Sequence, residues 1–322
     1  VNGHKLILKS DSDNVGATFN NTNPIILNNA DSYLKFTAEM TVDSVSSVAT
    51  INSSRGLKIY ESSTVNELSV AADTELSIAP DKSLSGTITI ATGSIRLNGP
   101  GTLASNVSMG GGTLDVDETA TVSGALSHSA DISIDVATGK TLTYSGTAIG
   151  VGANTITLSG GGNLVSGGMV LDNAQSKLLL NSITLDSAST SADSLGIDVD
   201  ANSTVTALTV GHITPVSIAT GKTLSGSISV SAGSIKLDET GTLASNVSMS
   251  SGTILDADES MIISGSVTDE GNFNNDQGWT INVAEGKTVN YTGQSIGVNG
   301  HKLILKSDSD NVGATFNNTN PI

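Results

Sequence analysis

The sequence predicts an all-β protein built as a parallel β-helix (β-solenoid), and three observations lead to this fold class. Short stretches alternate apolar and polar residues, glycine recurs at the corners between them, and aliphatic residues return at a regular spacing. Alternation with a period of two is typical of half-buried strands. Helical spacing of apolar residues is not sustained anywhere in the chain. We therefore expect stacked short strands from one end to the other.

The chain of 322 residues contains nested repeats. The segment 1–25 returns without one substitution as the segment 298–322, at an offset of 297. Within that period lie two diverged halves, which share the run from Gly101 to Met109 and from Gly241 to Met249. A solenoid can continue without a domain boundary, so length alone does not imply several domains. We expect one continuous β-solenoid over 1–322, with sub-repeats 1–150 and 151–297 and the start of the next repeat at 298–322.

The innermost period predicts the length of one coil. In the first half, aliphatic residues alternate between spacings of 8 and 11, at Leu57, Val65, Leu76, Leu84, Ile95, Leu103, Leu114 and Val122. The second half repeats this alternation at Ile197, Val205, Val216, Leu224, Ile235, Leu243, Ile254 and Ile262. One short and one long step sum to 19 residues, and some coils are longer, so we expect coils of about 19–22 residues and about 14 coils per repeat of 297.

Stacking gives these coils their stability. A single coil buries almost nothing, whereas stacked coils form ladders and align their aliphatic residues in columns along the axis. At about 4.8 Å per coil, 14 coils would extend about 67 Å. The general preference for right-handed crossovers between parallel strands favours a right-handed β-helix.

Glycine marks the expected corners of the coils. Gly139, Gly221 and Gly286 each precede a lysine, and Gly101 and Gly241 each precede a threonine. We expect these glycines to supply the positive backbone angles that sharp corners demand.

Composition excludes several classes of function. The net charge is -17, and a field of that sign repels the phosphate backbone, so nucleic acid is not an expected partner. No apolar run approaches the roughly 20 residues of a membrane helix, so membrane insertion of this segment is not expected. Cysteine is absent, which excludes disulfides and thiolate metal sites.

The sequence motifs of the coils resemble those of bacterial surface proteins. The phrase Gly-Lys-Thr-Leu at Gly139 to Leu142 and Gly221 to Leu224, and the run from Thr157 to Leu164, are similar to the passenger regions of autotransporters and to proteins of the filamentous-haemagglutinin type. This resemblance covers essentially the whole chain. It implies a right-handed β-helix that is secreted unfolded and acts at the bacterial surface as a fibre or adhesin.

The charged residues do not favour catalysis or tight metal binding. Polysaccharide lyases share this architecture, but they need clustered acids and a base on one face, whereas the acids here are scattered and only two arginines occur, Arg55 and Arg96. We expect no enzyme and no cofactor. Weak calcium candidates with alternating oxygen ligands are Asp11, Asp13, Asp115, Asp117, Asp256 and Asp258. They lack the glycine and distal glutamate of an EF-hand, so solvated turn acids that bind calcium loosely at most are favoured.

Trp279 is the only tryptophan and follows a short insertion near Thr268 to Asn274. We expect it to cover a coil rather than to serve as a platform for a sugar.

These observations favour a structural role. The leading hypothesis is a repeat segment of a long, stiff, acidic, extracellular fibre, with neighbouring repeats as end-to-end partners and lateral self-association as a further possibility. The second hypothesis is an adhesin module that binds glycan, or the surface of a host or neighbouring cell, through its loops.

Overall fold

The computed structural model of the protein describes residues 2–9, 16–48, 53–270, 278–298, 302–308 and 313–320. In this part of the chain there are no helices, strands make up 58%, and parallel sheets are stacked as a β-solenoid of about 14 turns. The predicted fold class is thereby confirmed. The described residues contain no helix that could cross a membrane.

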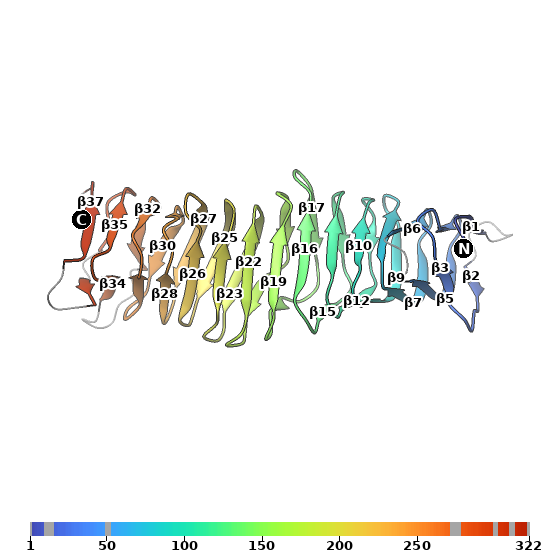
Figure 1. The fold of residues 1–322 in the computed structure, drawn as a ribbon, viewed down its shortest axis with the longest axis horizontal. Coiled ribbons are helices and arrows are strands. Elements are labelled where there is room, and N and C mark those ends of the chain that lie inside the picture. The colour runs from blue at the N-terminus through green and yellow to red at the C-terminus, as the bar shows by residue number, and fades with distance from the viewer. Residues whose placement is uncertain are drawn as a thin grey trace. The chain divides into compact units, whose positions relative to one another are not determined.

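The chain forms two compact units. The first contains residues 1–149 and 156–167, and the second contains residues 150–155 and 168–322. Within each unit, each coil runs through up to three ladders of parallel strands, which we call faces A, B and C. Strands that are neighbours on a face belong to consecutive coils, and their order can be followed along either unit in Figure 1.

In the first unit, face A consists of β1 (Lys5–Leu8), β4 (Tyr33–Phe36), β6 (Ser53–Ile59), β8 (Asp73–Ile78), β10 (Ser94–Leu97), β13 (Thr113–Val116), β16 (Ile132–Val136) and β19 (Thr155–Ser159). Face B contains β2 (Ala17–Phe19), β11 (Thr102–Leu103), β14 (Ala120–Val122), β17 (Thr141–Tyr144) and β20 (Asn163–Val165). Face C contains β3 (Ile25–Leu27), β12 (Asn106–Met109), β15 (Leu126–His128) and β18 (Ile149–Gly150). The long strands β5 (Met40–Ser47), β7 (Ser63–Val70) and β9 (Ser83–Ile90) run through both B and C.

In the second unit, face A consists of β22 (Lys177–Asn181), β24 (Gly196–Val199), β26 (Thr214–Ile218), β28 (Ser234–Leu237), β31 (Ile254–Ala257), β34 (Trp279–Val283) and β36 (Leu303–Ser307). Face B contains β29 (Thr242–Leu243), β32 (Met261–Ile263), β35 (Thr288–Tyr291) and β37 (Thr315–Asn318). Face C contains β21 (Met169–Leu171), β30 (Asn246–Met249) and β33 (Val267–Asp269). The strands β23 (Thr184–Thr190), β25 (Ser203–Val210) and β27 (Thr223–Val230) run through both B and C.

The bend between faces B and C depends on glycine. The first half of β9 pairs with β11 and its second half with β12, so β9 turns the corner without interruption. At this bend Gly86 has a φ of 119°, and a Cβ there would lie 1.7 Å from the carbonyl oxygen of Val65. Gly226 occupies the same place in β27, with a Cβ position 1.8 Å from the carbonyl oxygen of Val205. Only glycine fits where two backbones approach this closely.

The predicted corner glycines fall into two groups. Gly139, Gly221 and Gly286 have φ values of 75°, 72° and 70° with open space where a Cβ would be, which confirms the expected positive angles. The expectation is wrong for Gly101 and Gly241, which are not among the residues of positive φ. They are glycine for a different reason, because a Cβ at either position would meet the side chain of an isoleucine in the preceding coil at 2.3 or 2.4 Å.

The interior of each unit is mainly aliphatic. Strands such as β13, with the sequence TLDV, alternate half-buried and buried residues along their length. Leu114 of β13 and Ile134 of β16 pair in register and are fully buried. Burying one such side chain contributes about 1.5–3 kcal/mol, and each coil contributes several, so the stack as a whole supplies the stability that one coil lacks.

Coil length varies around the predicted value. The step from Ile197 to its partner Val216 has the predicted length, whereas the step from Leu255 to its partner Ile281 is longer. The longer coil contains the predicted insertion, of which residues 271–274 lie outside the described residues.

Two of the eight predicted core positions of the second half do not point inward. Ile262 is 41% exposed, whereas Ile263 is fully buried and pairs with Leu243. Ile254 is likewise only half-buried, and Leu255 takes its place in the core. The cause is one extra residue: six positions separate Met109 from its aspartate at 115, but seven separate Met249 from the aspartate at 256. One extra residue moves the side chains of the strands directly after it to the other face.

The junction between two repeats is an ordinary step from coil to coil. β36 has the sequence of residues 6–10, the start of the next repeat, and it pairs with β34 in register from Trp279 opposite Leu303 to Val283 opposite Ser307. β37 continues the next coil by pairing with β35. At the other end of the repeat the same sequence pairs through its other edge, with β1 against β4.

Candidate functional site

The outward side chains divide the surface into a charged face and hydroxyl faces. On face A, cross-strand neighbours include Glu75 opposite Arg96 and Arg96 opposite Asp115. On faces B and C the corresponding neighbours are mostly serine and threonine, as in the pair of Thr64 with Ser85, whose hydroxyls lie 2.8 Å apart. Any ligand would therefore meet ions on face A and hydroxyl groups on faces B and C.

Face C of each unit carries an in-register column of hydroxyl side chains. In the second unit the column is Ser189, Thr209, Ser229, Ser248 and Thr268, each paired with the next. In the first unit it is Ser46, Ser69, Thr89, Ser108 and Ser127. Because paired parallel strands are about 4.8 Å apart, the hydroxyls repeat at that interval.

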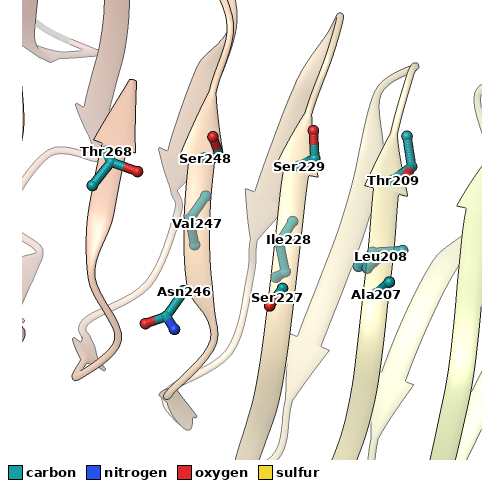
Figure 2. A pocket seen from close by; sticks show the side chains of 10 residues that line it. All are labelled: Ala207, Leu208, Thr209, Ser227, Ile228, Ser229, Asn246, Val247, Ser248 and Thr268. Carbon is teal, nitrogen blue, oxygen red and sulfur yellow. The ribbon is translucent and has the colours of Figure 1, made fainter. Parts of the chain in front are cut away.

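A groove of about 260 Å³ follows the column in the second unit. Figure 2 shows its lining on β25, β27, β30 and β33, with Ser229 and Ser248 beside one another and the column continuing to Thr268. The other lining residues are Ala207, Leu208, Thr209, Ser227, Ile228, Asn246 and Val247. Serine, threonine and asparagine side chains offer both donors and acceptors, so the groove suits a neutral ligand rich in hydroxyl groups. Its lining contains no acid, base or thiol.

Glu270 lies next to this hydroxyl column. Its carboxylate accepts hydrogen bonds from the hydroxyls of Ser229, at 2.5 Å, and Ser250, at 2.7 Å. These two bonds, with a smaller contribution from Ser248, hold the pKa of Glu270 below its ordinary value of 4.5, although burial opposes them by raising it. The ionised carboxylate thereby holds together hydroxyls from two coils.

The hydroxyl columns were not foreseen from the sequence. Their signal is a serine or threonine that recurs once in each coil, as from Ser189 to Thr268, and it becomes visible only when the register between coils is known.

The structure places two calcium candidates of the first unit around a cation of the chain. The Arg96 guanidinium donates to Asp115 at 2.9 Å and lies 3.3 Å from Asp117. The hydrogen bond and the charge of Asp115 raise the pKa of Arg96, against the opposing effect of burial. A metal ion at this place would have to displace the guanidinium.

The two candidates of the second unit also have partners in the chain. Asp258 pairs with Lys236 at 2.6 Å, while Asp256 accepts a hydrogen bond from the Asn282 amide at 2.8 Å. The same amide donates to Asp308 at 2.6 Å, so it bridges two carboxylates. Burial, with the repulsion of Asp258 and Asp308, raises the pKa of Asp256, although the bond from Asn282 lowers it.

Calcium binding stays a prediction. Asp11 and Asp13 lie outside the described residues. Within the described part of the chain, no three histidine, aspartate or glutamate side chains are grouped so as to hold a metal ion.

Trp279 is a core residue. It is fully buried at the start of β34, opposite Leu303 of the next repeat. This confirms that it covers a coil and is not a platform for a sugar.

Comparison of the chain with protein-family models, with curated proteins and with solved structures gives no match. The candidate surfaces therefore rest on their geometry and chemistry alone.

Proposed function

We propose that this chain is a repeat segment of a long secreted or cell-surface fibre. We further propose that it is related to the filamentous-haemagglutinin and autotransporter proteins of bacteria, whose sequence motifs it resembles. Its role is to form a stiff, acidic filament that extends from a surface. No enzymatic step is part of this proposal.

The observation that carries the proposal is the junction between repeats. Residues 6–8 pair with residues 34–36 through one edge of their strand, and the same sequence at residues 303–305 pairs with residues 279–281 through the opposite edge. A strand that pairs on both edges has a coil before it and a coil after it. Tandem copies would therefore stack without a break and would leave no edge open to unspecific pairing.

The exposure of one leucine also supports continuous stacking of tandem copies. Leu8 and Leu305 are the same position of the repeat, and Leu8 is 9% exposed where β4 packs beside it, whereas Leu305 is 51% exposed. The next coil of the following repeat would cover Leu305 as β4 covers Leu8.

Length measurement tests the fibre. Chains with one, two and three copies of the block 1–297 should form rods whose length in electron micrographs grows by about 67 Å per block, from about 14 coils at about 4.8 Å. Rods that keep the length of one block, or separately folded blocks joined by flexible linkers, would contradict the proposal.

The hydroxyl groove favours a second function, adhesion to surface glycan. Its donors and acceptors repeat at the coil spacing, and a neutral sugar chain presents repeated hydroxyls in return. A glycan array of the isolated chain, with Ser229→Val as the matched variant, tests it. If the wild type binds a glycan and the variant does not, the result would support adhesion. If the wild type binds no glycan, adhesion to glycan would be excluded and the fibre would remain as the proposed function.

A further inference from the structure

Five residues on face A of the first unit form a cationic surface in an otherwise acidic chain. We call Tyr33 and Lys35 of β4, Arg55 and Lys58 of β6, and Tyr60 just after β6 the basic patch. Three cation–ring contacts hold it together: Lys35 lies 4.3 Å from the Tyr60 ring centre, and Lys58 and Arg55 lie 5.4 Å and 5.9 Å from the Tyr33 ring centre.

The charges of the basic patch are poorly compensated within the chain. Lys35 and Lys58 are direct cross-strand neighbours, a placement in which like charges destabilise a sheet. Lys58 has one acidic neighbour, Glu75, at 3.9 Å. Among the described residues, neither Lys35 nor Arg55 forms an ion pair with a carboxylate. The three cations of the patch have a single acidic neighbour at 3.9 Å. This excess of positive charge indicates that an anionic group of another molecule binds here.

Face A of the second unit carries the complementary charges. We call Asp256, Asn282 and Asp308 the acidic patch, in which the single Asn282 amide serves two carboxylates. In the described part of the chain, neither Asp256 nor Asp308 forms an ion pair with a lysine or arginine. Burial, and then repulsion by Asp258 and Asp308, raises the pKa of Asp256, although the bond from Asn282 and the charge of Lys236, its cross-strand neighbour, lower it.

We propose that the basic patch of one copy of this chain binds the acidic patch of a second copy. Lys35 and Lys58 lie on neighbouring coils about 4.8 Å apart, whereas Asp256 lies on the coil before Asn282 and Asp308 on the coil after it, so the charges of both patches are spaced by one or two coil steps. Two chains whose coils run side by side therefore set cations opposite carboxylates. The contact goes beyond a fibre of stacked repeats, because it joins separate chains laterally.

An acidic glycan fits the basic patch less well. Stacking of a sugar ring on either tyrosine would compete with the lysine and arginine side chains of the patch, which lie over both rings, so a glycan would be held by its anionic groups alone. The patch thus presents positive charge more than aromatic surface, as a carboxylate partner requires.

Sedimentation of the chain 1–322 at about 0.1 M and about 1 M salt, where the Debye length falls from about 10 Å to about 3 Å, tests the contact. The wild type should associate at low salt and be monomeric at high salt. Two variants reverse the patches, K35E/R55E/K58E for the basic patch and D256K/D308K for the acidic patch. Each alone should be monomeric at both salt concentrations.

An equal mixture of the two variants is the decisive measurement. Each variant keeps the patch that the other has lost, so association should return in the mixture at low salt. The matched control K140E/K177E/K222E makes the same change of net charge on lysines outside both patches and should associate like the wild type. Far-ultraviolet circular dichroism and Trp279 emission show that each variant is folded.

Three results would overturn the proposal: a wild type that stays monomeric at low salt, a mixture that stays monomeric, or a control that loses association together with the basic-patch variant. A chain that binds heparin through the basic patch but does not self-associate would assign the patch to a glycan instead. None of these results depends on the length of tandem arrays, so failure of this contact and failure of the fibre are distinguishable.

Discussion

Ile262 and Ile263 are adjacent and chemically identical, yet one is 41% exposed and the other is fully buried. Their roles follow from a single extra residue upstream, which sets which of the two points into the solenoid. The contrast provides an internal control for the register of the second half.

We expect Ile263→Ala to lower the free energy of unfolding by about 2–5 kcal/mol, because it leaves a cavity in the core. Ile262→Ala should change it by about 0.5 kcal/mol or less, as is usual for an exposed position. Urea unfolding followed by circular dichroism measures both values. Equal losses, or a larger loss for Ile262→Ala, would show that the register described for β32 is wrong.

Glu270 makes a pH-dependent contribution to stability. Since its pKa is lowered in the folded chain, its ionised form stabilises the fold at any pH above the ordinary value of 4.5, and this contribution is lost as the pH falls through the lowered pKa. The wild type should therefore have a higher Tm than Glu270→Gln at neutral pH, and the difference should vanish in acid.

The double variant Ser229→Ala, Ser250→Ala is the matched control for Glu270. It removes the two hydrogen bonds that lower the pKa of Glu270 most, so adding Glu270→Gln to it should lower the Tm much less than the same substitution does in the wild type. A Tm difference that persists unchanged in acid would contradict this account.

At the scale of the element, the coil is the unit that can be added or removed. Each coil contacts its two neighbours through the ladders, so its removal joins two surfaces that match. Ile197 and Val216 are partners in consecutive coils. Deleting residues 197–215 therefore places Val216 where Ile197 was, opposite Leu178 of β22.

We expect the chain without residues 197–215 to fold, with unchanged circular dichroism per residue and buried Trp279 emission. Deleting only residues 206–215 should prevent folding, because it joins half of one coil to half of the next and breaks the register of all later strands. A shorter deletion that is tolerated as well as the longer one would contradict the coil as the structural unit.

Much of the coil could be predicted from the sequence, because period-two alternation and the alternating short and long steps between aliphatic residues are local signals. The slip at Ile254 could not, since Ile254 and Leu255 are both aliphatic and either could fill the core. The hydroxyl column through Ser229, and Lys35 opposite Lys58, were also missed. These features depend on which residues of different coils are opposite one another, and only the ladder register gives that information.

At the scale of the whole molecule, continuation of the chain changes the environment of the repeat ends. Leu305 is half exposed in the chain 1–322, whereas its counterpart Leu8 is almost buried by the coil that follows. The stability of the last coil should thus depend on what is attached to it, as in other repeat proteins.

Leu305→Ala should cost little in the chain 1–322. In a chain that continues through the next repeat, the same substitution should cost about 2–5 kcal/mol, as expected for a buried leucine. Leu8→Ala is the matched substitution and should be costly in both chains. Denaturant unfolding of the four variants checks this, and a cost at Leu305 that does not change with chain length would argue against continuous stacking.

The direction of the ladders also determines how such a chain responds to force. The hydrogen bonds between paired parallel strands run from coil to coil, so a pull on the two ends of a unit loads one coil at a time and does not shear all of them together. Each released coil of about 20 residues would add up to roughly 70 Å of extended chain. A filament of this kind would hold its length under small loads and lengthen in small steps under larger ones, dissipating energy while most of its coils stay folded.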